Sequence, residues 1–166
     1  DKSVRQFDSP PTGEDIARSI SEGLWRSSVA MELDGVLCDL SSRVDRSASV
    51  RLITTRDKEA LEIMRHSAAH IMAEAVQHLF ENAELTIGPV VADGFYYDID
   101  MEPVSEEVFP KIEAEIQAII KNKTPFVRRE VSREEALRLY QGQKYKTEII
   151  EGLDGETISI YTNGDF

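Results

Sequence analysis

Two histidines stand four residues apart in the stretch RHSAAH, at His66 and His70. Residues at i and i+4 of a helix project side by side, so this pair could hold a metal, position a water or hydrogen-bond a substrate. The zinc-protease motif adds a glutamate after the first histidine as the general base. That position holds Ser67, so the sequence does not fit a zinc protease.

A metal site needs more ligands than this pair supplies. Structural zinc takes four ligands and catalytic zinc usually three protein ligands. The sequence has one cysteine, Cys38, and no CxxC, and its third histidine, His78, lies well around the helix from the pair. We therefore predict no complete metal site within this chain. From the residues alone, a solvated or hydrogen-bonded histidine pair remains the simpler interpretation.

The pair lies on a predicted helix over about 58–80, with Asp57 as its N-cap. On a helical wheel, one side carries an apolar stripe that should face the core, formed by Leu61, Met64, Ala68, Ile71, Met72, Ala75, Val76 and Leu79. His66 and His70 fall on the opposite side, beside Ala69 and Ala73. We therefore expect the histidines to face either water or a second surface that the small alanines allow to approach.

The segments around this helix alternate between strand and helix patterns. Before it, we predict a strand at 3–7, a helix opened by a capping box at Thr12 and Asp15, a strand at 28–33, a hairpin turn at the DG dipeptide, and a strand at 49–54. This order indicates a β-grasp fold, whose last strand pairs with its first. After it, we predict strands at 85–89, 93–99, 126–131, 145–150 and 157–161, with helices following Pro110 and Ser132. The whole is predicted to be α+β.

Charge and hydropathy limit the partners. The net charge is −12, which argues against the chain gripping nucleic acid on its own. Residues 121–146 nevertheless carry eight bases and three acids, which makes either a solvated face or a local basic edge for a phosphate backbone. The apolar runs are too short to span a membrane, and no signal-peptide pattern opens the chain. We expect a cytoplasmic protein.

Taken together, the motifs resemble a known family. The stretches RHSAAHIMAEAVQHLF, TIGPVVADGFYYDI, REEA and YK resemble the N-terminal half of the bacterial threonyl-tRNA synthetases. TGEDIARSI, SVAMELDG and VRLITTRD resemble the TGS domain that comes first in that family. The resemblance implies a TGS β-grasp domain at 1–56. It also implies that 57–166 is the N-terminal part of a tRNA editing domain, ending before the CxxxH segment of that domain.

The editing domain of this family hydrolyses serine wrongly attached to the threonine tRNA. Serine lacks one methyl of threonine, and one methyl gives a synthetase only about 1–3 kcal/mol of discrimination. By resemblance, His66, His70 and Lys146 are catalytic, and Gly88, Tyr97 and Asp98 bind substrate. The histidines would orient a water or ribose hydroxyls, Lys146 would meet phosphate or developing negative charge, and Tyr97 would line the pocket.

The resemblance also implies parts that lie outside these residues. A catalytic domain with ATP, magnesium and zinc attaches threonine to tRNA(Thr), and the full-length family member is a homodimer through such domains. We expect no cofactor in this chain, no ligase activity and no efficient editing by it alone. One alternative is a TGS-containing binding or regulatory module, although such proteins lack the segment from Gly88 to Asp98 beside an HxxxH helix. The other is a zinc-dependent editing hydrolase of the alanyl type, which shares only the HxxxH.

Overall fold

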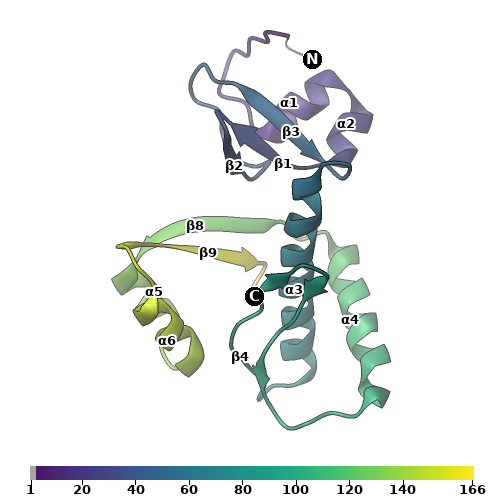
Figure 1. The fold of residues 1–166 in the computed structure, drawn as a ribbon, viewed down its shortest axis with the longest axis vertical. Coiled ribbons are helices and arrows are strands. Elements are labelled where there is room, and N and C mark those ends of the chain that lie inside the picture. Colours follow the sequence, from purple (N-terminus) through teal and green to yellow (C-terminus); the bar gives the residue numbers. More distant parts are fainter. Residues whose placement is uncertain (1–2) are drawn as a thin grey trace. The chain divides into compact units, whose positions relative to one another are not determined.

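The chain forms two compact units, unit 1 (Asp1–Arg65) and unit 2 (His66–Phe166), and the division falls within the long helix α3 (Lys58–Leu79). A computed structural model describes residues 3–166. Each unit combines helices with small antiparallel sheets, so the fold is α+β as predicted (Figure 1). Within the described residues, no helix is both long and apolar enough to cross a membrane.

Unit 1 is built on a three-stranded antiparallel sheet in the order β2–β1–β3, formed by β1 (Ser28–Leu33), β2 (Val36–Cys38) and β3 (Val50–Thr54). The predicted hairpin is confirmed. Asp34 and Gly35 both have positive φ, at 50° and 87°, as a type I′ turn requires. Ala30 and Ile53 of the sheet pack with Ala60 of α3 to form a buried cluster.

Two short helices precede this sheet, α1 (Gly13–Ile20) and α2 (Glu22–Ser27). The capping box of Thr12 and Asp15 is confirmed, with both reciprocal hydrogen bonds formed. The single predicted helix is divided at Ser21, whose extended backbone ends α1. The Ser21 hydroxyl then accepts a hydrogen bond from the Leu24 N–H and caps α2.

The predicted strand at 3–7 is wrong. These residues form no regular element, and β3 pairs with β1 instead of with a first strand. Val4 is 92% exposed and Phe7 is 39% exposed. An alternating pattern forms a strand only where a neighbour pairs with its backbone and a core covers its apolar face. Because Val4 and Phe7 are exposed, no core covers the apolar face of this segment.

In unit 2, the predicted strands 85–89 and 93–99 form one hairpin. Its arms pair through four short strands, β4 (Glu84–Leu85) with β7 (Ile99–Asp100) and β5 (Val90–Val91) with β6 (Gly94–Phe95). The 3₁₀ turn η1 (Glu106–Val108) leads into α4 (Phe109–Asn122), which has Pro110 in its first turn as predicted. The His78 ring contacts the Glu115 carboxylate at 2.8 Å and joins α3 to α4.

The rest of unit 2 is a two-stranded antiparallel ribbon of β8 (Phe126–Ser132) and β9 (Thr157–Asn163). Figure 1 shows α5 (Arg133–Leu139) and α6 (Lys144–Gly152) at the end where β8 finishes and β9 begins. Ile158 and Ile160 of β9 and Val131 of β8 pack there against Ala136 and Ile150 of these helices.

The predicted strand at 145–150 is wrong, because these residues lie in α6. Six residues are too few for an apolar pattern to separate a strand from a helix. In the folded chain, the Thr147 N–H and hydroxyl both donate to the Gln143 carbonyl at 3.0 Å, one helical turn back. Helical phase also brings Ile150, which is 5% exposed, into the cluster with Val131 and Ala136.

The predicted core stripe of α3 is only partly right. Ala75 and Val76 are buried as expected, but Leu61, Met64 and Leu79 are 54%, 50% and 38% exposed. Ala69 and Ala73, on the side assigned to the histidines, are 2% and 0% exposed. Part of the packed side of α3 is therefore the side that carries these small residues.

Candidate functional site

The predicted site begins with the histidine pair on α3. The Nε2 atoms of His66 and His70 lie 3.1 Å apart, with ring centroids separated by 4.7 Å and planes inclined by 79°. At that separation one ring nitrogen donates a hydrogen bond and the other accepts it, which requires at least one ring to be neutral. The i, i+4 spacing in a regular helix is sufficient to bring the two rings together.

His70 is neutral at pH 7. Burial lowers the pKa of His70 to about 4, and the positive charges of His66 and Lys146 act in the same direction. Burial also lowers the pKa of Lys146, which is half-buried on α6. The structure therefore brings both His66 and Lys146 within electrostatic range of His70, although Lys146 comes from a helix and not from the predicted strand.

Aromatic side chains of the β8–β9 ribbon form a wall opposite the pair. The Tyr161 ring lies 6.4 Å from His66 and 6.2 Å from His70, and the Phe126 ring lies 6.0 Å from His70, between centroids. Phe126 pairs with Asn163 across the ribbon, and Tyr161 lies two residues before Asn163, so all three side chains share one face. Aromatic rings of the ribbon therefore lie on the histidine side of α3.

A buried polar contact lies on the same faces of α3 and β9. Glu74 is 7% exposed and Asn163 is 4% exposed, and the Asn163 Nδ2 donates to the Glu74 Oε2 at 2.7 Å. Among residues 3–166, the Asn163 Oδ1 is a buried oxygen with no hydrogen-bond partner, which costs about 1–3 kcal/mol. Sequence reasoning missed Glu74, although it continues the fourfold spacing of the pair.

The other three predicted residues lie on the hairpin of unit 2. A methyl group added at Gly88 would overlap two atoms of the Tyr97 ring and lie 2.9 Å from its Cγ, so the ring packs directly on the glycine. Gly88 therefore lies on a hairpin arm under an aromatic ring, and the turn itself is between Val91 and Gly94. Burial raises the pKa of Tyr97.

Asp98 is held through its backbone. Its N–H donates to the Ile87 carbonyl at 2.9 Å, and its carbonyl accepts from the Thr86 N–H and hydroxyl. Its carboxylate is on an exposed residue. The six predicted residues thus form two sets, the histidines with Lys146 and the hairpin set of Gly88, Tyr97 and Asp98.

The chain is similar to known proteins along its whole length, although no protein-family model matches it. The chain is 64% identical over 166 residues to the threonine–tRNA ligase of Desulfosudis oleivorans and 60% identical to that of Desulforapulum autotrophicum. It is 45% identical over 170 residues to that of Gluconobacter oxydans. From end to end, the chain matches the N-terminal region of threonine–tRNA ligases. It spans 26% of the length of these three relatives, at their N-terminal end.

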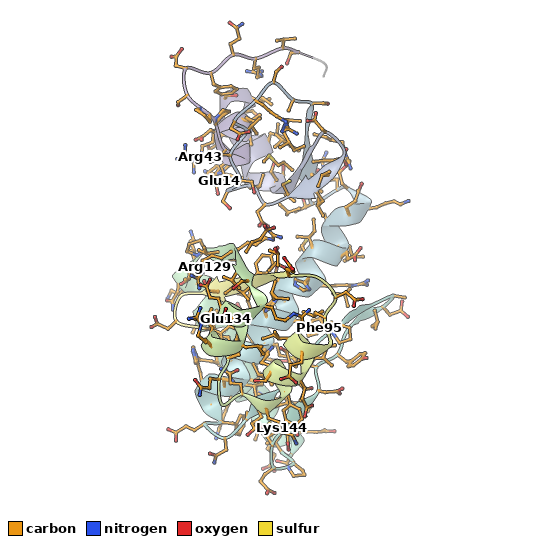
Figure 2. All side chains as sticks on the ribbon, turned by 90° about the vertical axis from the view of Figure 1, so that its left-hand side faces the viewer. Glu14, Arg43, Phe95, Arg129, Glu134 and Lys144 are labelled. Carbon is orange, nitrogen blue, oxygen red and sulfur yellow. The ribbon has the colours of Figure 1, made fainter. Side chains whose placement is uncertain are left out.

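Two further features of the chain bear on the site. A cavity of about 200 Å³ is lined by Gln77, Glu84 and Tyr145, and by Lys144 at the start of α6 (Figure 2), but by none of the six predicted residues. Within residues 3–166, no cluster of three or more His, Cys, Asp or Glu residues could hold a metal ion.

Proposed function

We propose that the histidine site is the hydrolytic editing site of a threonine–tRNA ligase, acting on serine attached to tRNA(Thr). The observation that carries this proposal is the neutral, half-buried His70 in contact with His66 and in range of the Lys146 charge. The relatives are threonine–tRNA ligases by name, and a ligase that selects threonine has to reject serine, which lacks one methyl.

The reaction is the hydrolysis of an ester. A water molecule attacks the seryl carbonyl, the bond from that carbon to the ribose oxygen breaks, and the products are serine and tRNA with a free terminal hydroxyl. A neutral imidazole accepts the proton of the attacking water and returns one to the leaving ribose oxygen. The Lys146 ammonium stabilises the negative charge that develops on the carbonyl oxygen or meets a nearby phosphate.

The hairpin residues would supply selectivity. The packing of Tyr97 on Gly88 fixes the position of a rigid ring, and a fixed wall can exclude a methyl that a mobile side chain would accommodate. Under this proposal, Tyr97 lines the pocket for the seryl group. The backbone hydrogen bonds of Asp98 hold the adjoining arm in place.

The proposal extends to the organisation of the whole protein. Residues 1–56 would be a TGS domain, and residues 57–166 the first part of an editing domain completed by a later CxxxH segment. Attachment of threonine to tRNA(Thr) with ATP, together with bound magnesium and zinc, would be carried out by domains outside these residues. The complete enzyme would be a cytoplasmic homodimer.

The decisive experiment compares variants of a complete ligase that contains these residues. His66→Ala combined with His70→Ala should abolish the deacylation of seryl-tRNA(Thr) while threonylation continues at the parent rate. His78→Ala is the matched control, because His78 is on the same helix but contacts Glu115 of α4. If the double variant clears seryl-tRNA(Thr) at the parent rate, the site assignment is wrong.

A further inference from the structure

The Glu74–Asn163 contact lies in line with the histidine pair. Glu74 follows His70 by four residues and His66 by eight, so the three side chains form one row along α3. Their neighbours on the ribbon form a second row, because Tyr161 and Asn163 share a face of β9. The two rows face each other, with Tyr161 opposite the histidines and Asn163 opposite Glu74.

The backbone at Asn163 is also fixed. Its N–H donates to the Phe166 carbonyl at 2.8 Å, and its carbonyl accepts from the Phe166 N–H at 3.2 Å. The turn between them has Gly164 at φ 64°, a conformation that glycine adopts without strain. Asn163 is therefore held by a tight turn through its backbone and by Glu74 through its side chain.

We propose that Glu74 and Asn163 are a positioning pair that sets Tyr161 against His66 and His70. The core cluster on the other face of the ribbon, which includes Ile158 and Ile160, fixes which side chains of β9 face α3. The Glu74–Asn163 bond would fix where along α3 that face lies, and a slide of the ribbon along the helix would carry Tyr161 away from the imidazoles. Apolar packing has no preferred direction and tolerates such a slide. A directional hydrogen bond between two buried groups does not, since every other register would leave the Glu74 carboxylate buried without this donor.

The catalytic consequence rests on the proposed editing function, but the positioning itself can be measured without activity. Nuclear Overhauser cross-peaks between the Tyr161 ring and the two imidazoles report whether the ring contacts are formed in this 166-residue chain. Asn163→Leu removes the donor at nearly constant volume and should abolish these contacts. In a complete ligase it should lower kcat for seryl-tRNA deacylation by at least about 100-fold, because a displacement of about 1 Å already has that effect, with a smaller change in KM.

Two further variants separate positioning from general stability. Glu74→Gln keeps an acceptor for Asn163 Nδ2 and adds a donor for its Oδ1, so ring contacts and kcat should remain near the parent values. Val131→Ala weakens the packing on the other face of the ribbon and should lower the melting temperature while leaving the ring contacts intact. If Asn163→Leu does not fold, Glu74→Met breaks the same bond from the helix side.

The outcomes distinguish this inference from the proposed function. Retention of the Tyr161–histidine contacts in Asn163→Leu or Glu74→Met would overturn the positioning role. Loss of those contacts in Val131→Ala would also overturn it, since any destabilisation would then move the wall. Should the contacts respond as expected while the double histidine variant still deacylates seryl-tRNA(Thr), the positioning pair stands and the editing assignment is the part that fails.

Discussion

The low pKa of His70 makes the stability of unit 2 depend on pH in a defined direction. Burial lowers this pKa to about 4, whereas the histidine of an unfolded chain has its ordinary pKa of 6.5. Between about pH 4 and pH 6.5, the His70 side chain therefore binds a proton in the unfolded state but not in the folded state. Stability from this group is complete above pH 6.5 and is lost as pH falls through 6.5 toward 4.

The size of the effect follows from the shift. At about 1.4 kcal/mol per unit of pKa, the full loss is about 3 kcal/mol. About 2 kcal/mol of this stability is lost when the pH is lowered from about 7.5 to about 5, a range in which most carboxyl groups stay ionised. The groups that act on His70 are His66 and Lys146, so Lys146→Met should raise the pKa of His70 modestly while burial keeps it below 6.5.

Urea unfolding followed by circular dichroism at these two pH values measures the change in the free energy of unfolding. His70→Asn is the matched control, because it keeps a polar group without an ionisation in this range. The parent should lose about 2 kcal/mol more than the variant between the two pH values. A nuclear magnetic resonance titration of the His70 imidazole provides a direct check. A measured pKa at or above 6, or equal losses in parent and variant, would refute the argument that His70 is neutral because it is buried.

Two other substitutions test packing in unit 2. Gly88→Ala should destabilise the fold by about 1–3 kcal/mol, because the added methyl overlaps the Tyr97 ring. In thermal melts, most of that loss should disappear when Tyr97→Ala is also present. A loss of stability that Tyr97→Ala does not change would contradict the ring contact. The Arg133 guanidinium donates to four backbone carbonyls, those of Ile150, Glu151, Leu153 and Gly155. Arg133→Met should therefore lower the free energy of unfolding by about 1.5–3 kcal/mol and speed hydrogen exchange at the end of α6. Arg129→Met is the control, because Arg129 is an exposed residue of β8 (Figure 2), and it should have neither effect. Equal effects of the two substitutions would argue against the role of the four carbonyl contacts.

Local signals in the sequence predicted most elements correctly. The capping box at Thr12, the DG turn at Asp34 and Pro110 at the start of α4 all act within a few residues, so their effects do not depend on the rest of the fold. The incorrect predictions concern segments whose secondary structure depends on contacts with distant parts of the chain. Residues 3–7 alternate like a strand without apolar burial, and residues 145–150 form a helix because that phase places Ile150 in a core.

The sequence by itself determined the histidine pair. An i, i+4 spacing in a regular helix brings His66 and His70 together whatever packs around them. The family resemblance added Lys146, Gly88, Tyr97 and Asp98 as candidates. Their assignment to binding or catalysis remains a prediction.

Only the tertiary structure decided what surrounds the pair. Packing of the ribbon on α3 placed Tyr161 and Phe126 against the imidazoles, buried His70 enough to keep it neutral, and joined Glu74 to Asn163 across 89 residues of sequence. No local pattern encodes these contacts, because they depend on which face of β9 meets which face of α3. A helical wheel gives the direction of a side chain, whereas burial and pKa depend on what the rest of the chain places there.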